Sequence, residues 1–176
     1  MICNNIIDKY HLFERKNKYI VDTNVLIALF GNKKYNQQIN ENSKLKKAIE
    51  NYNKAIDNHC IVYVPAIVLS EFVNLFFNER FNELKSKYPN KYHNFKKDYR
   101  NKNEYIKDCN YIKDVIEKQI LNDLKPISDD FDKLSIEQMF KFDEDDFNDR
   151  LIIHIANINN LYVISADADV KKIKIN

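Results

Sequence analysis

The chain has 176 residues, of which 44% are hydrophobic and 31% are charged, and its formal net charge is +2. This size fits one domain with its own core and leaves little room for a second, and the composition is typical of globular rather than disordered proteins. The charge is too small to indicate nucleic-acid binding by itself. Cys3, Cys60 and Cys109 lack metal or disulfide spacing, and no segment has the roughly 18–20 apolar residues of a membrane span. We therefore expect a protein of the reducing cytoplasm that makes no membrane contact.

Short apolar strands alternate with helical patterns along the chain. Residues 1–18 are expected to form a short helix or a flexible arm, and residues 127–148 are mostly loop-like. In chain order, the other predicted elements are a strand at 19–22, helices at 25–30 and about 40–57, a strand at 61–64, helices from 66 and at about 105–120, a short helix around 135–140, a helix at 149–156 and a strand at 161–165. This alternation is typical of an α/β fold with a parallel sheet and right-handed crossovers.

Four acids interrupt these apolar patterns. Asp22 ends the first strand and Asp167 follows the last one, so parallel strands bring both carboxylates to one edge of the sheet. Glu71 lies in the first turns of the helix after the second strand, and Asp149 begins the helix before the last strand. Like charges at close range repel unless a proton or a cation neutralises them. Oxygen ligands without a nearby Cys or His pair favour Mg²⁺ or Mn²⁺, so the pattern predicts one metal site.

Each of these acids also has an ordinary structural interpretation. Asp22 and Asp149 could cap the helices that follow them, and Glu71 could be a solvated helical residue. The acidic run at 143–146 is better explained as a solvated loop than as a ligand set. His154 falls on an apolar helical face, which favours a packed core histidine over a general base.

Four motifs carry a resemblance to a known family. They are Val21-Asp22-Thr23-Asn24, Ser70-Glu71-Phe72, Asn148-Asp149-Arg150-Leu151 and Ile164-Ser165-Ala166-Asp167-Ala168-Asp169. In this order and spacing they resemble the PIN-domain ribonucleases, and the resemblance spans residues 19 to 170. It implies a three-layer α/β/α PIN-like domain with a central parallel sheet, formed by residues 1–176 as a single nuclease domain. The chain departs from compact members through an N-terminal extension at 1–18 and a basic, aromatic helical insertion at about 79–125.

The resemblance also implies roles for individual residues. The catalytic and metal-binding acids would be Asp22, Glu71, Asp149 and Asp167, which hold one or two Mg²⁺ or Mn²⁺ ions, with Asp169 as an auxiliary ligand. Asn24 and Ser165 would support them, with Thr23 as a weaker candidate. The implied activity is that of a metal-dependent endoribonuclease, which cleaves single-stranded or loop RNA with metal-activated water. Because many members are toxins of type II toxin–antitoxin pairs, a cognate antitoxin protein and a homodimer are the implied partners.

The insertion mixes cations with aromatic rings. Phosphates need positive charge and unpaired bases stack on rings, so this composition suits RNA. The alternative is an amphipathic helix that packs its tyrosines and phenylalanines inward, and the sequence leaves both interpretations open. The candidate RNA-binding residues are Lys91, Tyr92, Lys96, Lys97, Tyr99 and Arg100.

Two other functions compete with the nuclease. A phosphatase of the haloacid-dehalogenase type also uses an Asp after its first strand, but it requires a second Asp two positions later, where this chain has Asn24. A catalytically silent PIN-like module that binds RNA or protein is the second rival. Silent members lose one or more of the metal ligands, whereas all four acids are present here.

Overall fold

Four parallel strands form the centre of the protein. The computed structural model describes residue 7 and residues 10–31, 42–139 and 147–166. In these ranges the sheet has the strand order β3-β2-β1-β4. Its strands are β1 (Lys18–Val21), β2 (Ile61–Pro65), β3 (Lys125–Ile127) and β4 (Tyr162–Ile164). Neighbouring strands are parallel, with Val21 opposite Ile164 and Ile20 opposite Tyr63. The predicted parallel sheet is confirmed.

The core lies on both faces of this sheet. Tyr19, Ile20 and Val21 of β1 are completely buried, because β1 lies between two neighbouring strands and beneath helices. Parallel strands covered on both faces read as continuous apolar runs rather than as an alternating pattern. This burial explains why the apolar run before Asp22 predicted the strand correctly.

The sequence pattern did not predict strand β3. Only three residues form it, and the middle one is Pro126, which has no N–H to donate to a neighbouring strand. Proline is therefore tolerated in a sheet mainly at an edge. Strand β3 is the edge strand beside β2 in the sheet that the structure describes. Its hydrogen bonds come from tertiary pairing, which the local sequence does not reveal.

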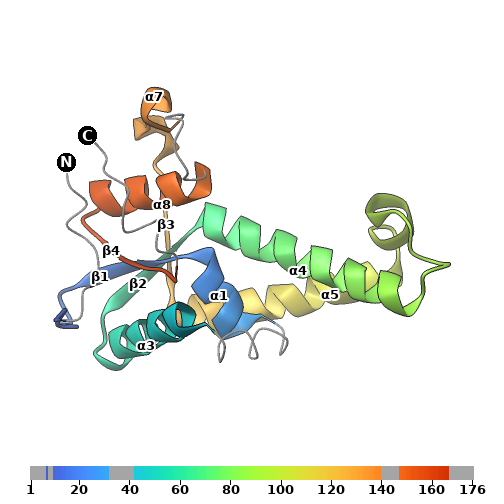
Figure 1. The fold of residues 1–176 in the computed structure, drawn as a ribbon, viewed down its shortest axis with the longest axis horizontal. Helices are drawn as coiled ribbons and strands as arrows, with labels where there is room; N and C mark the ends of the chain where they lie inside the picture. Colours follow the sequence, from blue (N-terminus) through green and yellow to red (C-terminus); the bar gives the residue numbers. More distant parts are fainter. Residues whose placement is uncertain (1–6, 8–9, 32–41, 140–146, 167–176) are drawn as a thin grey trace.

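Helices cover both faces of the sheet and make the three-layer α/β/α arrangement. Figure 1 shows α8 (Phe147–Ile158) on one side, against β1 and β4, and α1 (Thr23–Phe30) and α3 (Ser43–Asp57) on the other. Helix α3 begins at Ser43 because the Asn42 side chain accepts hydrogen bonds from the N–H groups of Lys44 and Leu45. The short helices are α6 (Leu121–Asp123) and α7 (Ile136–Met139).

Two long helices leave the body of the domain together. Helix α4 (Ala66–Lys87) and helix α5 (Asn103–Val115) run side by side to the far end of the molecule in Figure 1. In the sequence, a π-helical turn, Phe95–Tyr99, separates α4 from α5, and a second π-helical turn, Ile116–Ile120, continues α5. We call residues 79–115 the arm and residues 85–107 the arm tip. Among the helices that the structure describes, none is both long and apolar enough to cross a membrane.

The segment before β1 packs against the sheet. The structure gives turns rather than a helix for residues 10–17. The His11 ring lies 4.4 Å from the Tyr162 ring, centre to centre, and its Nε2 is 2.8 Å from the Tyr19 hydroxyl. Burial raises the pKa of Tyr19 to about 12. Of the two expectations for this segment, a short helix or a flexible arm, residues 10–17 do not form the helix, and aromatic contacts hold them against the sheet.

Candidate metal and active site

Asp22 occupies the junction between β1 and α1. It is 3% exposed, and its N–H donates to the Ile164 carbonyl of β4 over 3.1 Å. The Asp22 carboxylate also caps α1, since Oδ1 accepts the Thr23 N–H at 2.6 Å. The positive end of a helix dipole favours a carboxylate at this position. Asp22 therefore fulfils the ordinary capping role and still lies at the carboxyl edge of the sheet, where the functional interpretation requires it.

Ser165 lies directly against Asp22. It follows β4, and its hydroxyl donates to Asp22 Oδ2 over 2.7 Å although 143 positions separate the two residues. The chain leaves β1 toward β2 on one side, whereas β4 lies on the other side of β1. Asp22 and Ser165 thus meet at the point where the strand order reverses, which is where open α/β sheets bind ligands.

Glu71 joins this cluster through Thr23. The Thr23 hydroxyl donates to Glu71 Oε2 over 2.7 Å, and Thr23 is 4% exposed. Glu71 lies in the second turn of α4, whose first residue, Ala66, donates its N–H to Asp129 Oδ1 over 2.9 Å. We call the hydrogen-bonded series Ser165, Asp22, Thr23 and Glu71 the carboxylate chain. The sequence ranked Thr23 below Asn24 and Ser165, and nothing in the local pattern revealed its link to Glu71.

The other expected site residues are less closely joined. Asn24 follows Thr23 in α1 and is exposed, and Asp149 is half-buried in the first turn of α8. Asp167, Asp169 and the acidic run at 143–146 lie outside the described residues. Within the described ranges, no three Asp, Glu, His or Cys side chains gather as a metal site. The complete four-acid site therefore stays a prediction.

Helix α8 carries two further residues of interest, His154 and Arg150. His154 is half-buried, and its Nε2 is a buried atom that has no hydrogen-bond partner among the residues that the structure describes. Arg150, next to Asp149, is 6% exposed. A fully buried arginine is rare unless it is paired, so Arg150 is a site candidate to which the sequence analysis gave no role. The signal was a cation at the start of the apolar run 151–153.

The donor atoms of the carboxylate chain suit a hard cation. They are carboxylate and hydroxyl oxygens from β1, α1, α4 and the end of β4. Mg²⁺ and Mn²⁺ prefer oxygen ligands, and carboxylates hold them best. The residues present therefore fit the ion that the sequence implied, with Asp22 and Glu71 as the described ligand candidates.

The insertion separates into buried rings and exposed cations. Tyr92 and Tyr99 are completely buried, which favours the inward-packing interpretation of the insertion over base stacking by these two tyrosines. The Tyr99 hydroxyl donates to Asp108 Oδ2 over 2.7 Å, and burial, followed by this hydrogen bond, raises the pKa of Tyr99. The other candidate RNA-binding residues, Lys91, Lys96, Lys97 and Arg100, are exposed.

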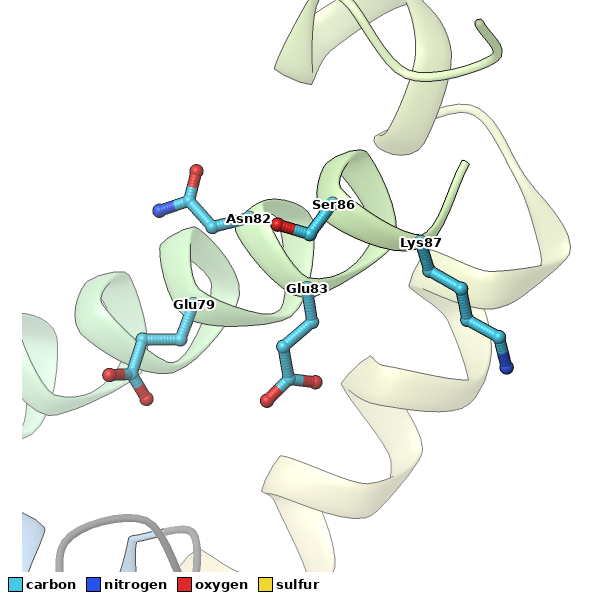
Figure 2. Close-up of a pocket in the computed structure, with 5 residues that line it drawn as sticks. All are labelled: Glu79, Asn82, Glu83, Ser86 and Lys87. Carbon is cyan, nitrogen blue, oxygen red and sulfur yellow. The ribbon is translucent and has the colours of Figure 1, made fainter. Parts of the chain in front are cut away.

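A pocket of about 520 Å³ lies on the arm rather than at the carboxylate chain. Figure 2 shows the five residues that line it, all on α4: Glu79, Asn82, Glu83, Ser86 and Lys87. Glu79 is eight residues beyond Glu71, which corresponds to about 12 Å along a helix. Glu83 also forms an ion pair with Arg80 of the same helix. This pocket is therefore separate from the candidate active site.

One family model agrees with this geometry. A model described as PIN domain matches residues 19–176, a range that contains the four predicted acids and starts within β1. No curated protein matches the chain, and no solved structure matches it.

Proposed function

The chain belongs to the PIN-domain family, which has a nuclease-type fold, and on that premise we propose that it is a metal-dependent endoribonuclease. The proposed substrate is single-stranded or loop RNA. The observation that supports the proposal best is the carboxylate chain, because it joins two predicted ligands, Asp22 and Glu71, across 49 positions of sequence at the carboxyl edge of the sheet.

The residues of this chain would hold and orient the ion. Asp22 and Glu71, together with Asp149 and Asp167, are the proposed ligands, and Mg²⁺ or Mn²⁺ when bound supplies the positive charge that polarises water and phosphate. Ser165 and Thr23 each donate a hydroxyl hydrogen bond to a ligand carboxylate. Such supporting bonds fix the direction in which the carboxylate oxygens point. Burial of Asp22 keeps bulk water from competing with that geometry.

The experiment compares cleavage of a labelled, unstructured RNA in Mn²⁺, in Mg²⁺ and in excess EDTA. We expect cleavage with either metal and none with EDTA, and we expect Asp22→Asn and Glu71→Gln to abolish it. Matched controls are Asp57→Asn and Glu50→Gln, which neutralise exposed acids on α3. Undiminished cleavage in EDTA would remove the metal mechanism.

A silent PIN-like module remains the second candidate. A silent module would bind the same RNA equally well with and without EDTA and would not cleave it. The comparison of Mn²⁺ with EDTA therefore separates the two candidates.

We extend the proposal to partners on the strength of the family resemblance. A toxin role implies a cognate antitoxin, a homodimer and a cytoplasmic location. The neighbouring reading frame tests this part. A small DNA-binding protein encoded there, which suppresses the cleavage when the two are mixed, would support the toxin assignment, whereas its failure to bind would contradict it.

A further inference from the structure

Charge is distributed unevenly along this chain. The arm tip, residues 85–107, carries eight lysines and arginines against two acids, a net charge of +6. The remaining 153 residues carry 20 cations against 24 acids, a net charge of −4. The small net charge of the whole protein therefore conceals a strongly basic region, which lies at the far end of α4 and α5 in Figure 1.

A small core of its own holds the arm tip in shape. The Tyr99 hydroxyl and the Arg80 guanidinium both donate to Asp108, over 2.7 and 3.2 Å. The Phe95 ring lies 5.3 Å from the Tyr99 ring and 5.4 Å from the Phe81 ring, centre to centre. Phe81, Phe95 and Tyr99 are thus used for packing, and they join α4, α5 and the π-helical turn into one unit.

Side-chain hydrogen bonds fix the π-helical turn. Asn94 Oδ1 accepts the N–H groups of Lys96 and Lys97, over 3.0 and 3.1 Å. Asp98 Oδ2 accepts the N–H groups of Asn94 and His93, over 2.7 and 2.8 Å, and these bonds lower the pKa of Asp98. The negative charge of Asp98 is therefore directed at backbone N–H groups of its own turn.

Seven of the eight tip cations are exposed and form no ion pair with a carboxylate in the part of the chain that the structure describes. Four of the seven lie in the π-helical turn or just after it: Lys96, Lys97, Arg100 and Lys102. By contrast, Lys91 is 3.4 Å from Glu104, and its Nζ lies 5.1 Å from the centre of the Tyr92 ring. Clustered like charges repel one another unless an anion compensates them. Tyr88 adds an exposed ring to this surface, since 46% of it is accessible.

Helix α4 connects this surface to the candidate active site. Lys87, at the end of α4, is 16 residues beyond Glu71, which corresponds to about 24 Å along the helix. At the 3.4 Å rise of one strand in a duplex, that distance corresponds to roughly seven nucleotides. An extended single strand would span the same 24 Å with fewer nucleotides. Only an RNA longer than a few nucleotides could reach both places.

We propose that the arm tip is a second binding surface for the phosphate backbone of the RNA, reached along α4, whose last residue, Lys87, is about 24 Å from Glu71 along the helix. This inference rests on the proposed nuclease function for its substrate class. RNA is favoured over an acidic protein because α4 carries Glu71 in its second turn and Lys85 and Lys87 in its last turn, so a strand bound at the carboxylate chain can continue along this helix to the tip. The exposed Tyr88 ring, whose centre is 5.4 Å from Lys87 Nζ, also suits base stacking.

The test uses the variant in which Lys96, Lys97, Arg100 and Lys102 are all changed to Gln, and its control changes Lys44, Lys46, Lys47 and Lys54 of α3 to Gln. Both remove four positive charges from exposed positions. RNA binding is measured in EDTA from 50 to 300 mM salt, with unstructured RNAs of 5 and 30 nucleotides. Thermal melting verifies that each variant is folded. If the variant with four changes in the tip melts early, a Lys96→Gln/Lys97→Gln variant takes its place.

We expect the tip variant to lose more affinity for the 30-nucleotide RNA, which can reach both places, than for the 5-nucleotide RNA. The slope of log affinity against log salt should become shallower by up to about 2.8, since single strands contribute roughly 0.7 per phosphate contact. The α3 variant should keep the wild-type slope. Equal losses in both variants, or an unchanged slope in the tip variant, would overturn the proposal.

Two further outcomes separate this inference from the proposed function. If the wild type never cleaves RNA but the tip variant shows the expected change of slope, the nuclease proposal fails and the RNA surface stands. If the tip variant binds RNA like wild type but loses an acidic partner protein, the surface belongs to that protein and the RNA assignment is overturned.

Discussion

Two buried acids, Asp22 at the sheet edge and Asp108 in the arm, show how different partners give a carboxylate different roles. Asp108 accepts hydrogen bonds from a guanidinium and a tyrosine hydroxyl, so its charge is neutralised within the arm. Asp22 accepts hydrogen bonds from a serine hydroxyl and a backbone N–H, and both bonds orient its carboxylate at the carboxyl edge of the sheet. We infer that Asp108 stabilises the fold and, under the proposed function, that Asp22 is a metal ligand. The predictions below test this contrast.

The largest expected effect is the loss of cleavage in Asp22→Asn. A bound metal supplies several kcal/mol of transition-state stabilisation, and each ~1.4 kcal/mol is tenfold in rate, so we expect a loss of about 10³-fold or more. The melting temperature without metal should stay the same or rise, because one of several converging negative charges is removed. Cleavage rates and thermal melting of the same preparation measure both effects. A variant that unfolds early would instead give Asp22 a structural role like that of Asp108.

Asp108→Ala should produce the reverse pattern. It removes two hydrogen bonds from a residue that is 8% exposed, and hydrogen bonds to charged groups contribute about 1.5–3 kcal/mol each. The melting temperature should fall by several degrees, while cleavage of a 5-nucleotide RNA stays unchanged. The control is Asp114→Ala, which removes an exposed acid from the same helix. Loss of cleavage without loss of stability would contradict the structural role.

The supporting hydroxyls should have intermediate effects. Ser165→Ala removes the bond to Asp22, and loss of such supporting contacts typically costs 10–100-fold in metal affinity or activity. We expect cleavage to be partly restored at high Mn²⁺, since the ligands themselves remain. Ser70→Ala is the control, because Ser70 is exposed beside Glu71. A loss in Ser165→Ala as large as in Asp22→Asn would mean that Ser165 has a more direct role.

The smallest expected effect is a local loosening of the π-helical turn in the arm tip at acidic pH. The backbone hydrogen bonds from Asn94 and His93 lower the pKa of Asp98 in the folded protein. Its contribution to stability is therefore complete above the usual aspartate pKa of about 3.9, and it is lost as the pH falls through the lower folded value. The protection of the amides of residues 93–98 against exchange, relative to an unstructured peptide at the same pH, should fall below about pH 4, and Asp98→Ala should show this lower protection at every pH. Unchanged exchange in Asp98→Ala would remove the proposed role of Asp98 in fixing the turn.

The sequence by itself determined the elements whose residues repeat regularly. Strand β1 and helix α3 follow from an apolar run and a helical period, and the acid that ends the apolar run of β1 is enough to predict Asp22 at the sheet edge. The family match over residues 19–176 agrees with that order of motifs. These features depend on local patterns, which one sequence can show.

Only the tertiary structure decided which side chains meet. The bond between Thr23 and Glu71 requires α1 to pack against α4, and β3 exists because β2 offers a partner to a segment that contains proline. The sequence left open whether Tyr99 is buried, and the π-helical turn, which does not follow the usual period of 3.6 residues, decided it. Contacts between distant segments depend on packing, and packing is not contained in the spacing of residues along the chain.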